Sequence, residues 1–176
     1  TDTLYGIIAD AYDKDAVERV YRVKERSRDK PLPLLLGESH HAAGLVETSP
    51  LFWKLAKAFW PGPLTIVSEP GPEAPGHIRE WSGIGVRLPD CPLCRRVASM
   101  LRGVVTGTSA NLSGAENPLT AHQAMSMLGD SVDLYVDTGI VRIGRPSTVV
   151  DIRGGEVKII REGAIPAESI LRVARG

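Results

Sequence analysis

The chain has 176 residues, of which 43% are hydrophobic and 24% charged, and its 21 basic and 21 acidic side chains leave no net charge. This length and composition are typical of one globular domain with a sizeable core. A net charge of zero argues against a protein that grips nucleic acid over its whole surface, but it leaves room for one basic groove. No apolar run approaches the roughly 20 residues of a membrane span, and no signal peptide is visible. We therefore expect a cytoplasmic protein with no membrane partner.

The first part of the chain predicts a helix that ends in a basic cluster. Asp13 is a suitable N-cap for a helix from Lys14 to Arg26, with apolar residues at helical spacing. From Arg19 to Lys30 there are six basic residues and two acidic ones. Such a cluster is either a solvated helix end, where cations favour the negative end of the helix dipole, or a set of charges placed to bind an anion.

Pro31 stops that helix, and Leu32–Leu36 predicts a short buried strand in which Pro33 indicates an edge or a bulge. Beyond it, helices and strands alternate, with Ser49 as the N-cap of the first strong helix. The expected elements are a weak helix over Glu38–Leu45, a helix over Pro50–Phe59, a strand over Leu64–Val67, a loop over residues 69–77, a strand over Ile84–Leu88 and a helix over Pro92–Leu101.

Two features of this middle region suggest anion binding. Arg87 lies between apolar neighbours in its predicted strand, where it either faces solvent or binds an anion. After a short strand at Val104–Val105, residues 106–114 form a loop dense in hydroxyls and glycines, with Asn111 near its centre. Such loops are either simple turns or turn backbone N–H groups toward an anion. No Walker lysine follows, so the loop is not a P-loop.

The last third predicts a helix over Ala121–Leu128, capped by Thr120, and ends in a hairpin and a helix. The remaining elements are a strand over Leu134–Val136, a loop over Ile140–Pro146, hairpin strands over Ser147–Ile152 and Val157–Arg161, and a closing helix over Pro166–Ala174. Because hairpin strands are antiparallel, Ser147 and Arg161 should lie near the same end. The alternation predicts a single α/β domain over residues 1–176, with a mixed sheet and flanking helices. The chain lacks an initiator methionine, so we expect a strand upstream of Thr1.

The only two cysteines, Cys91 and Cys94, form one Cys-Pro-Leu-Cys sequence. Redox and half-zinc interpretations both apply to such a pair. A zinc site needs about four ligands, and the chain has no second pair. We therefore favour a packing role for both residues at the start of a helix, in a reducing cytosol.

The candidate site residues are cations and neutral hydrogen-bonding groups. They are Lys24, Arg26, Lys30, Arg87 and Arg161, together with Ser109, Asn111 and Ser147. No histidine lies in a hydroxyl-rich segment, no Gly-x-Ser-x-Gly elbow is present, and no carboxylate pair has a spacing suited to acid–base work. A site of this kind suits phosphoryl or nucleotidyl transfer, in which positioning and charge stabilisation do the chemistry.

Eight segments, in order along essentially the whole chain, resemble the YrdC/TsaC family of threonylcarbamoyl-adenylate synthases in its short, single-domain form. They are Thr1–Gly6, Lys24-x-Arg26, Lys30–Leu32, Trp60–Thr65, Val86–Pro89, Ser109–Gly114, Ser147–Asp151 and Arg161–Gly163. The resemblance implies a twisted α/β sheet with a concave, positive face. It implies an enzyme that joins L-threonine, bicarbonate and ATP into threonylcarbamoyl-AMP and pyrophosphate, with Mg²⁺ on the phosphates. A separate transferase complex would pass the product to adenosine 37 of tRNA.

The resemblance also implies residue roles. Catalysis would involve Lys24, Arg26, Ser109 and Asn111. Threonine would contact Thr3, Arg87, Gly107 and Ser147. ATP would contact Arg26, Lys30, Ser109, Asn117 and Arg161. The chain departs from the family at two positions, with Leu35 where some members carry a histidine and Gly107 where others have alanine or serine.

Two other functions are compatible with the same pattern. One is a non-catalytic paralogue that binds double-stranded RNA or tRNA, although this chain keeps the Lys-x-Arg and Ser-x-Asn elements expected of synthases. The other is the carbamoyl-transfer module of hydrogenase maturation proteins, which is embedded in much longer chains with zinc-finger segments that this sequence lacks.

Overall fold

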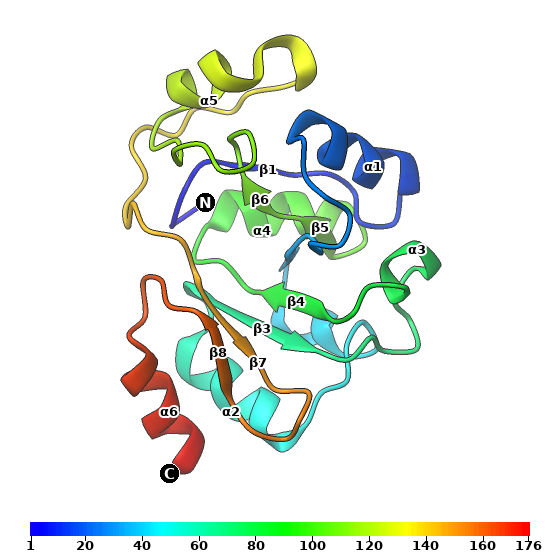
Figure 1. The fold of residues 1–176 in the computed structure, drawn as a ribbon, viewed down its shortest axis with the longest axis vertical. Coiled ribbons are helices and arrows are strands. Elements are labelled where there is room, and N and C mark those ends of the chain that lie inside the picture. Colours follow the sequence, from blue (N-terminus) through cyan, green and yellow to red (C-terminus); the bar gives the residue numbers. More distant parts are fainter.

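The computed structural model describes residues 1–176 and is built on a six-stranded mixed sheet (Figure 1). In spatial order its strands are β5 (Val104–Thr106), β2 (Leu34–Leu36), β4 (Ile84–Arg87), β3 (Leu64–Ser68), β7 (Thr148–Asp151) and β8 (Lys158–Arg161). The β2–β4 and β3–β7 pairs are parallel and the other three are antiparallel. A separate antiparallel pair joins β1 (Gly6–Ile7) to β6 (Thr108–Ser109). The predicted mixed α/β class is confirmed.

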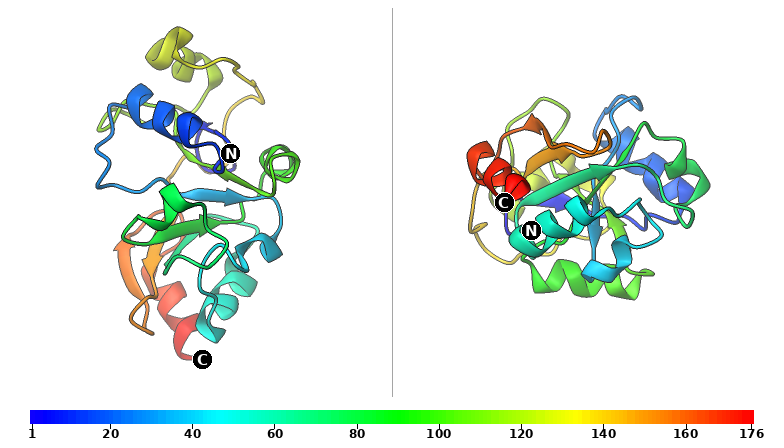
Figure 2. Two further views of the ribbon diagram at one scale, coloured as in Figure 1. Left: turned by 90° about the vertical axis from the view of Figure 1, so that its right-hand side faces the viewer. Right: turned by 90° about the horizontal axis from the view of Figure 1, so that it is seen from below.

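Helices flank both parts of this framework. They are α1 (Lys14–Val23), α2 (Pro50–Phe59), α3 (Gly76–Arg79), α4 (Pro92–Met100), α5 (Ala121–Leu128) and α6 (Ala167–Arg175), with 3-10 helices at Ser39–Ala42 and Gly129–Ser131. Helices α1 and α5 lie with β1 and β6 in the upper half, whereas α2 and α6 pack together below the sheet (Figures 1 and 2). None of the helices has the length and apolar character needed to cross a bilayer.

The helix N-termini form where the sequence supplies a cap. The Asp13 carboxylate accepts hydrogen bonds from the backbone N–H groups of Asp15 and Ala16, at 2.9 and 3.1 Å. Ser49 and Thr120 cap α2 and α5 in the same way. Each cap satisfies a donor that the first helical turn leaves unpaired. The predicted starts of these three helices are therefore confirmed.

Two large cores fill the two halves, and a third cluster of three buried residues includes Leu35. The larger has 20 buried residues and joins α2 and α6 to the sheet, with Phe52, Leu55, Ile66, Val86 and Ile170 among its members. The smaller has eight and joins α1 and α5 to β1; its members are Ile7, Val17, Val20, Tyr21, Leu32, Ala110, Ala124 and Leu128. Because each half buries its own apolar surface, the space between them is available for polar side chains.

Some predicted elements differ from the structure. Leu134–Val136 is not a strand; Leu134 and Val136 are 74% and 52% exposed, and no neighbouring strand pairs with them. The prediction of an edge or bulge at Pro33 is also wrong, because Pro33 lies just before β2, which is an interior strand. Its missing N–H therefore costs no ladder hydrogen bond.

Other differences concern element length. Helix α1 ends at Val23 rather than Arg26, because Lys24 is its C-cap and Glu25 adopts a positive φ of 50°. The helix expected over Glu38–Leu45 is a single 3-10 turn. The two-residue strands β1 and β6 and the short helix α3 were not predicted, since so few residues show no periodicity.

Thr148 fixes the end of the hairpin that carries Ser147 and Arg161. Its fully buried hydroxyl donates to the Ile165 carbonyl at 2.6 Å and accepts from the N–H groups of Gly163 and Ile165. We predict that the isosteric Thr148→Val change lowers the free energy of unfolding by about 2 kcal/mol, because it leaves buried backbone groups unpaired. Chemical denaturation of this variant beside exposed Thr138→Val checks it; equal stabilities would contradict the role of Thr148.

Candidate active site

A polar cavity of about 350 Å³ lies between the two halves of the molecule. Its volume is within the usual range for small-molecule sites. Eight of the predicted site residues line it: Thr3, Arg26, Arg87, Gly107, Ser109, Asn117, Ser147 and Arg161. These residues come from segments spread over most of the chain, so the fold brings together what the sequence keeps apart.

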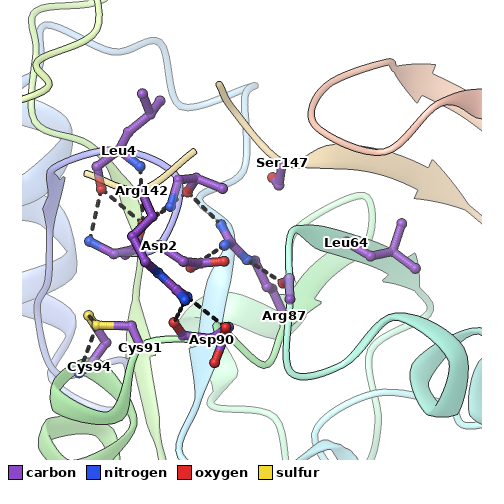
Figure 3. A network of polar contacts seen from close by, with 12 residues as sticks. Asp2, Leu4, Leu64, Arg87, Asp90, Cys91, Cys94, Arg142 and Ser147 are labelled. Atoms are coloured by element: carbon purple, nitrogen blue, oxygen red, sulfur yellow. Dashed lines mark hydrogen bonds and ion pairs between the residues drawn. The ribbon is translucent and has the colours of Figure 1, made fainter. Parts of the chain in front are cut away.

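Arg87, on the interior strand β4, is the most constrained of these side chains. It is 5% exposed, and its guanidinium donates to the Gly62 carbonyl, to Thr3 Oγ1 at 2.9 Å and to Asp2 Oδ1 at 2.5 Å (Figure 3). The Gly62 carbonyl follows the cis Trp60–Pro61 bond. A guanidinium has five N–H donors, so two remain for a ligand. Of the two sequence-based interpretations of Arg87, the structure excludes the solvent-facing one.

Asp2 is one of two site residues, with Thr65, that sequence reasoning missed. It lies in the Thr1–Gly6 segment, but nothing in the sequence indicated a carboxylate paired with Arg87. Its side chain is fully buried, and its second oxygen, Oδ2, accepts no hydrogen bond. Burial lowers the pKa of Arg87, and the charge of Asp2 opposes that effect. The pair therefore keeps a buried cation at the cavity wall.

Arg26 and Arg161 supply the uncompensated charge of the cavity. Arg26 donates to the carbonyls of Lys30 and Pro31, and Arg161 donates to the Ser147 carbonyl at 2.8 Å. Neither forms an ion pair with a carboxylate, because none of the seven ion pairs of the structure includes Arg26 or Arg161. Burial, then the charges of Arg26 and Arg87, lowers the pKa of Arg161. Arg26 and Arg87 thus repel Arg161, and an anion bound beside Arg161 would relieve that repulsion.

Lys24 is buried and serves the loop rather than the cavity. Its ammonium donates to the carbonyls of Ser109 and Asn111, the latter at 2.6 Å, and to Asn111 Oδ1 at 3.3 Å. These contacts use all three of its N–H donors. Asn111 also accepts from the Ser109 hydroxyl at 2.6 Å and donates to the Ala115 carbonyl. Lys24 and Asn111 therefore hold the 109–111 backbone in place, and of the three residues only Ser109 lines the cavity.

At the opposite wall, the predicted proximity of Ser147 and Arg161 is confirmed. The Ser147 hydroxyl also shares a 2.9 Å hydrogen bond with Thr65 Oγ1 from β3. Thr65 lines the cavity but was not among the predicted site residues, although it belongs to the quoted Trp60–Thr65 segment. Gly163 packs so closely behind Ser147 that an added Cβ would overlap the Pro146 carbonyl.

Gly107 and Leu35, the two departures from the family pattern, contact each other. A Cβ added at Gly107 would overlap the Leu35 side chain, which is buried and lines the cavity. The Gly107 N–H donates to the Pro33 carbonyl at 2.8 Å, which fixes the close approach. The Leu35 side chain therefore occupies the space that a side chain at position 107 would need, so the two departures depend on each other.

Lys30 was predicted to contact ATP, but the structure places it outside the cavity. It is exposed in the basic cluster and does not line the cavity. Lys24 and Asn111 also lie outside the lining, although their hydrogen bonds connect them to it. The remaining predicted residues converge.

A family model for Sua5/YciO/YrdC proteins, with the description "Telomere recombination", matches residues 1–163. The chain belongs to this family. It is 36% identical over 172 residues to the putative threonylcarbamoyl-AMP synthase of Methanocaldococcus jannaschii, covering 98% of this chain and 81% of that protein. It is similarly 32% identical to the threonylcarbamoyl-AMP synthase of Pyrococcus abyssi, of which it spans 52%.

Solved structures agree with this assignment. The crystal structure of P. abyssi Sua5 complexed with L-threonine superposes with a TM-score of 0.91 at 32% identity, covering 98% of this chain and 52% of that one. The chain thus spans about half the length of that Sua5 protein. E. coli YciO superposes with a TM-score of 0.81 at 22% identity over 97% of this chain and 84% of that one, which shows a shared fold alone.

The buried Lys24 of this Sua5/YciO/YrdC domain makes stability depend on pH. Burial, with the charge of Arg26, lowers the pKa of Lys24 from 10.5 to about 8. Between these values the unfolded chain binds the extra proton, so the free energy of unfolding rises with pH. We predict that wild-type protein gains about 2 kcal/mol from pH 8 to pH 10 relative to Lys24→Met. Denaturant titrations at both pH values check this; a constant difference between the two proteins would contradict it.

The contact between Gly107 and Leu35 predicts strong coupling. Gly107→Ala should lower the free energy of unfolding by about 1–3 kcal/mol through overpacking. Adding Leu35→Ala should relieve that clash, so the double variant should lose less stability than the two single variants together. Denaturation of all four proteins measures this coupling; additive losses would contradict the contact.

Proposed function

We propose that this chain is an L-threonylcarbamoyladenylate synthase, a nucleotidyltransferase that converts L-threonine, bicarbonate and ATP into threonylcarbamoyl-AMP, pyrophosphate and water. Several relatives with 32–37% identity carry the name threonylcarbamoyl-AMP synthase, which supports a transferase. The L-threonine complex of the P. abyssi protein supports threonine as a substrate.

The observation that carries the proposal is the meeting of Arg26, Arg87 and Arg161 at one cavity, with a carboxylate partner for Arg87 alone. The threonine carboxylate, bicarbonate and the triphosphate are all anions. Guanidinium groups suit carboxylate and phosphate oxygens because their parallel N–H groups bind both oxygens of a pair. A cavity with two uncompensated guanidiniums therefore fits a reaction in which every substrate brings negative charge.

The threonine end of the cavity is best assigned to Arg87 and its surroundings. Two guanidinium N–H groups of Arg87 have no protein acceptor, and a carboxylate is the ligand that suits them. The hydroxyls of Thr3, Thr65 and Ser147 lie on the same cavity lining and offer hydrogen bonds to the threonine hydroxyl and amine. Gly107 adds no side chain to the cavity lining, and the neighbouring Leu35 provides an apolar contact there.

The ATP end is best assigned to Arg26, Arg161, Ser109 and Asn117. The two arginines are anchored by backbone carbonyls rather than by carboxylates, so their charges stay available to phosphate oxygens. Ser109 lies where Lys24 fixes the backbone, and it lines the cavity at this end, which supports a contact with the adenylate. Lys30 is close to Arg26 in sequence, but it is exposed and does not line the cavity. It would therefore contact the phosphates only from outside the cavity lining.

The chemistry proceeds in two steps. The threonine amine attacks the bicarbonate carbon, water leaves, and a carbamate forms. A carbamate oxygen then attacks the α-phosphorus of ATP, and the bond to pyrophosphate breaks. Neither step requires a protein nucleophile, in agreement with a cavity lined by hydroxyls and guanidiniums. The residues act by aligning the reacting groups and stabilising the negative charge that develops on phosphate oxygens.

Mg²⁺ fits this site as part of the ATP substrate. The cavity lining contains no carboxylate, and nowhere in the chain do three histidine, cysteine, aspartate or glutamate side chains gather around one point. Mg²⁺ prefers oxygen ligands and keeps several waters when it is held by substrate phosphates. The ion would therefore be bound by the phosphates, with hydroxyls such as Ser109 nearby. The product would then pass to a transferase complex that modifies tRNA.

Pyrophosphate release tests the proposed reaction. With ATP, L-threonine and bicarbonate together, we expect release that stops when any one of the three is omitted. If release persists without threonine, the protein hydrolyses ATP instead. If no release occurs with all three, the RNA-binding alternative gains support, and salt-dependent binding of tRNA or double-stranded RNA should then be measured.

Substitutions should distinguish side chains that act in the cavity from charged side chains at the surface. We predict that Arg26→Ala and Ser109→Ala each cut ATP-dependent turnover at least tenfold, which is about 1.4 kcal/mol of transition-state stabilisation. Arg28→Ala is the matched control, because Arg28 lies in the same basic cluster but its side chain is 66% exposed and pairs with Glu18. Circular dichroism should show an unchanged fold. Wild-type turnover in both cavity variants would contradict the proposed site.

A further inference from the structure

Cys91 and Cys94 lie together at the start of α4, outside the cavity described above. Cys91 is the N-cap of this helix and Cys94 lies in its first turn, with Pro92 between them at the first helical position. Their sulfur atoms are 2.7 Å apart, and neither cysteine is in a disulfide (Figure 3). Two thiols this close can form a bond without backbone movement. Sequence alone favoured packing, but packing does not explain two sulfurs that face each other.

The two cysteines differ in exposure. Cys91 is half-buried, whereas Cys94 is 7% exposed. Both line an apolar groove of about 350 Å³ that is separate in character from the polar cavity, with 17 hydrophobic residues among its 21. The groove is bounded by α4, by β1 and by the exposed segment around Leu134. A small molecule in this groove would meet Cys91 first, while Cys94 lies behind it.

The surroundings favour the thiolate form of Cys91. Its sulfur accepts a hydrogen bond from the Cys94 N–H at 3.4 Å, where the helix presents the positive end of its dipole. The hydrogen bond with Cys94 lowers the pKa of Cys91 to about 6, and the same contact raises the pKa of Cys94. Among nearby charges, the Thr1 ammonium also lowers the pKa of Cys91, whereas the Asp2 carboxylate raises it. Exposure and hydrogen bonding thus both favour Cys91 over Cys94 as a nucleophile.

We propose that Cys91 and Cys94 form a redox-active dithiol site whose substrate is a low-molecular-weight disulfide. The Cys91 thiolate attacks one sulfur of the disulfide, so a mixed disulfide forms and one thiolate leaves. Cys94 then loses its proton to solvent and attacks Cys91 Sγ, which displaces the second thiolate. In total, the two protein thiols give up two electrons and two protons, and the small disulfide is reduced to two thiols.

Oxidised glutathione is the probe for this site. We expect wild-type protein to lose the mass of two hydrogen atoms and both free thiols on incubation with it, and to regain them with reduced glutathione. This measurement needs no substitution, so it does not depend on whether a variant folds. Two free thiols that persist in excess oxidised glutathione, in protein that remains folded by circular dichroism, would overturn the proposal.

Single substitutions distinguish the two roles. Cys94→Ser should trap one glutathione on Cys91, because the resolving thiol is absent. Cys91→Ser should be modified about tenfold more slowly, because the remaining thiol of Cys94 is only 7% exposed. Equal rates of modification in the two variants would overturn the assignment of Cys91 as the nucleophile. Thermal denaturation of each variant confirms that the rates refer to folded protein.

Discussion

The buried guanidinium of Arg87 is the interaction on which the arrangement of the cavity depends. It joins three parts of the chain that are far apart in sequence: strand β4, the turn at Gly62 and the first three residues. A buried arginine is costly unless its charge is paired and hydrogen-bonded. Asp2, Thr3 and Gly62 provide that pairing, so the N-terminal segment is held against the sheet, and the space between the two cores becomes a polar cavity rather than an apolar seam.

A second buried cation, Lys24, fixes the part of the cavity wall that contains Ser109. Lys24 ends helix α1 and uses its ammonium to hold the carbonyls of Ser109 and Asn111. The basic cluster thus contains cations with different roles. Lys24 positions a loop, Arg26 lines the cavity, and Arg28 and Lys30 remain at the surface. Sequence shows only that the cluster is basic, because the burial of each side chain depends on how the following chain folds over it.

The sequence predicted the elements with strong local signals. Helices α1, α2 and α5 begin where Asp13, Ser49 and Thr120 cap them, and the last hairpin pairs as expected. The strand predicted at Leu134–Val136 failed because its apolar residues have no sheet neighbour. Strands β1 and β6 escaped prediction because two residues carry no periodicity, although their pairing places Ser109 on the cavity wall. Local pattern is informative for capped helices, whereas short strands depend on a partner that only the fold supplies.

The residues of the candidate site also divide into those that the sequence identifies and those that only the fold reveals. Residue type identified five of the residues that line the cavity, namely Arg26, Arg87, Ser109, Ser147 and Arg161, and the family resemblance added Thr3, Gly107 and Asn117. Asp2 and Thr65 could not be assigned that way. Asp2 matters through its partner across the sheet, and Thr65 through its hydrogen bond with Ser147. The packing of Leu35 against Gly107 was likewise visible only in three dimensions, where the two departures from the family pattern prove to be neighbours.

The proposed function requires that threonine and ATP bind together in the cavity between the two cores. A crystal structure of the protein with L-threonine and a non-hydrolysable ATP analogue tests it most directly. We expect the threonine carboxylate on the free N–H groups of Arg87 and the phosphates between Arg26 and Arg161. Threonine or nucleotide bound elsewhere, with the cavity filled only by solvent, would contradict it.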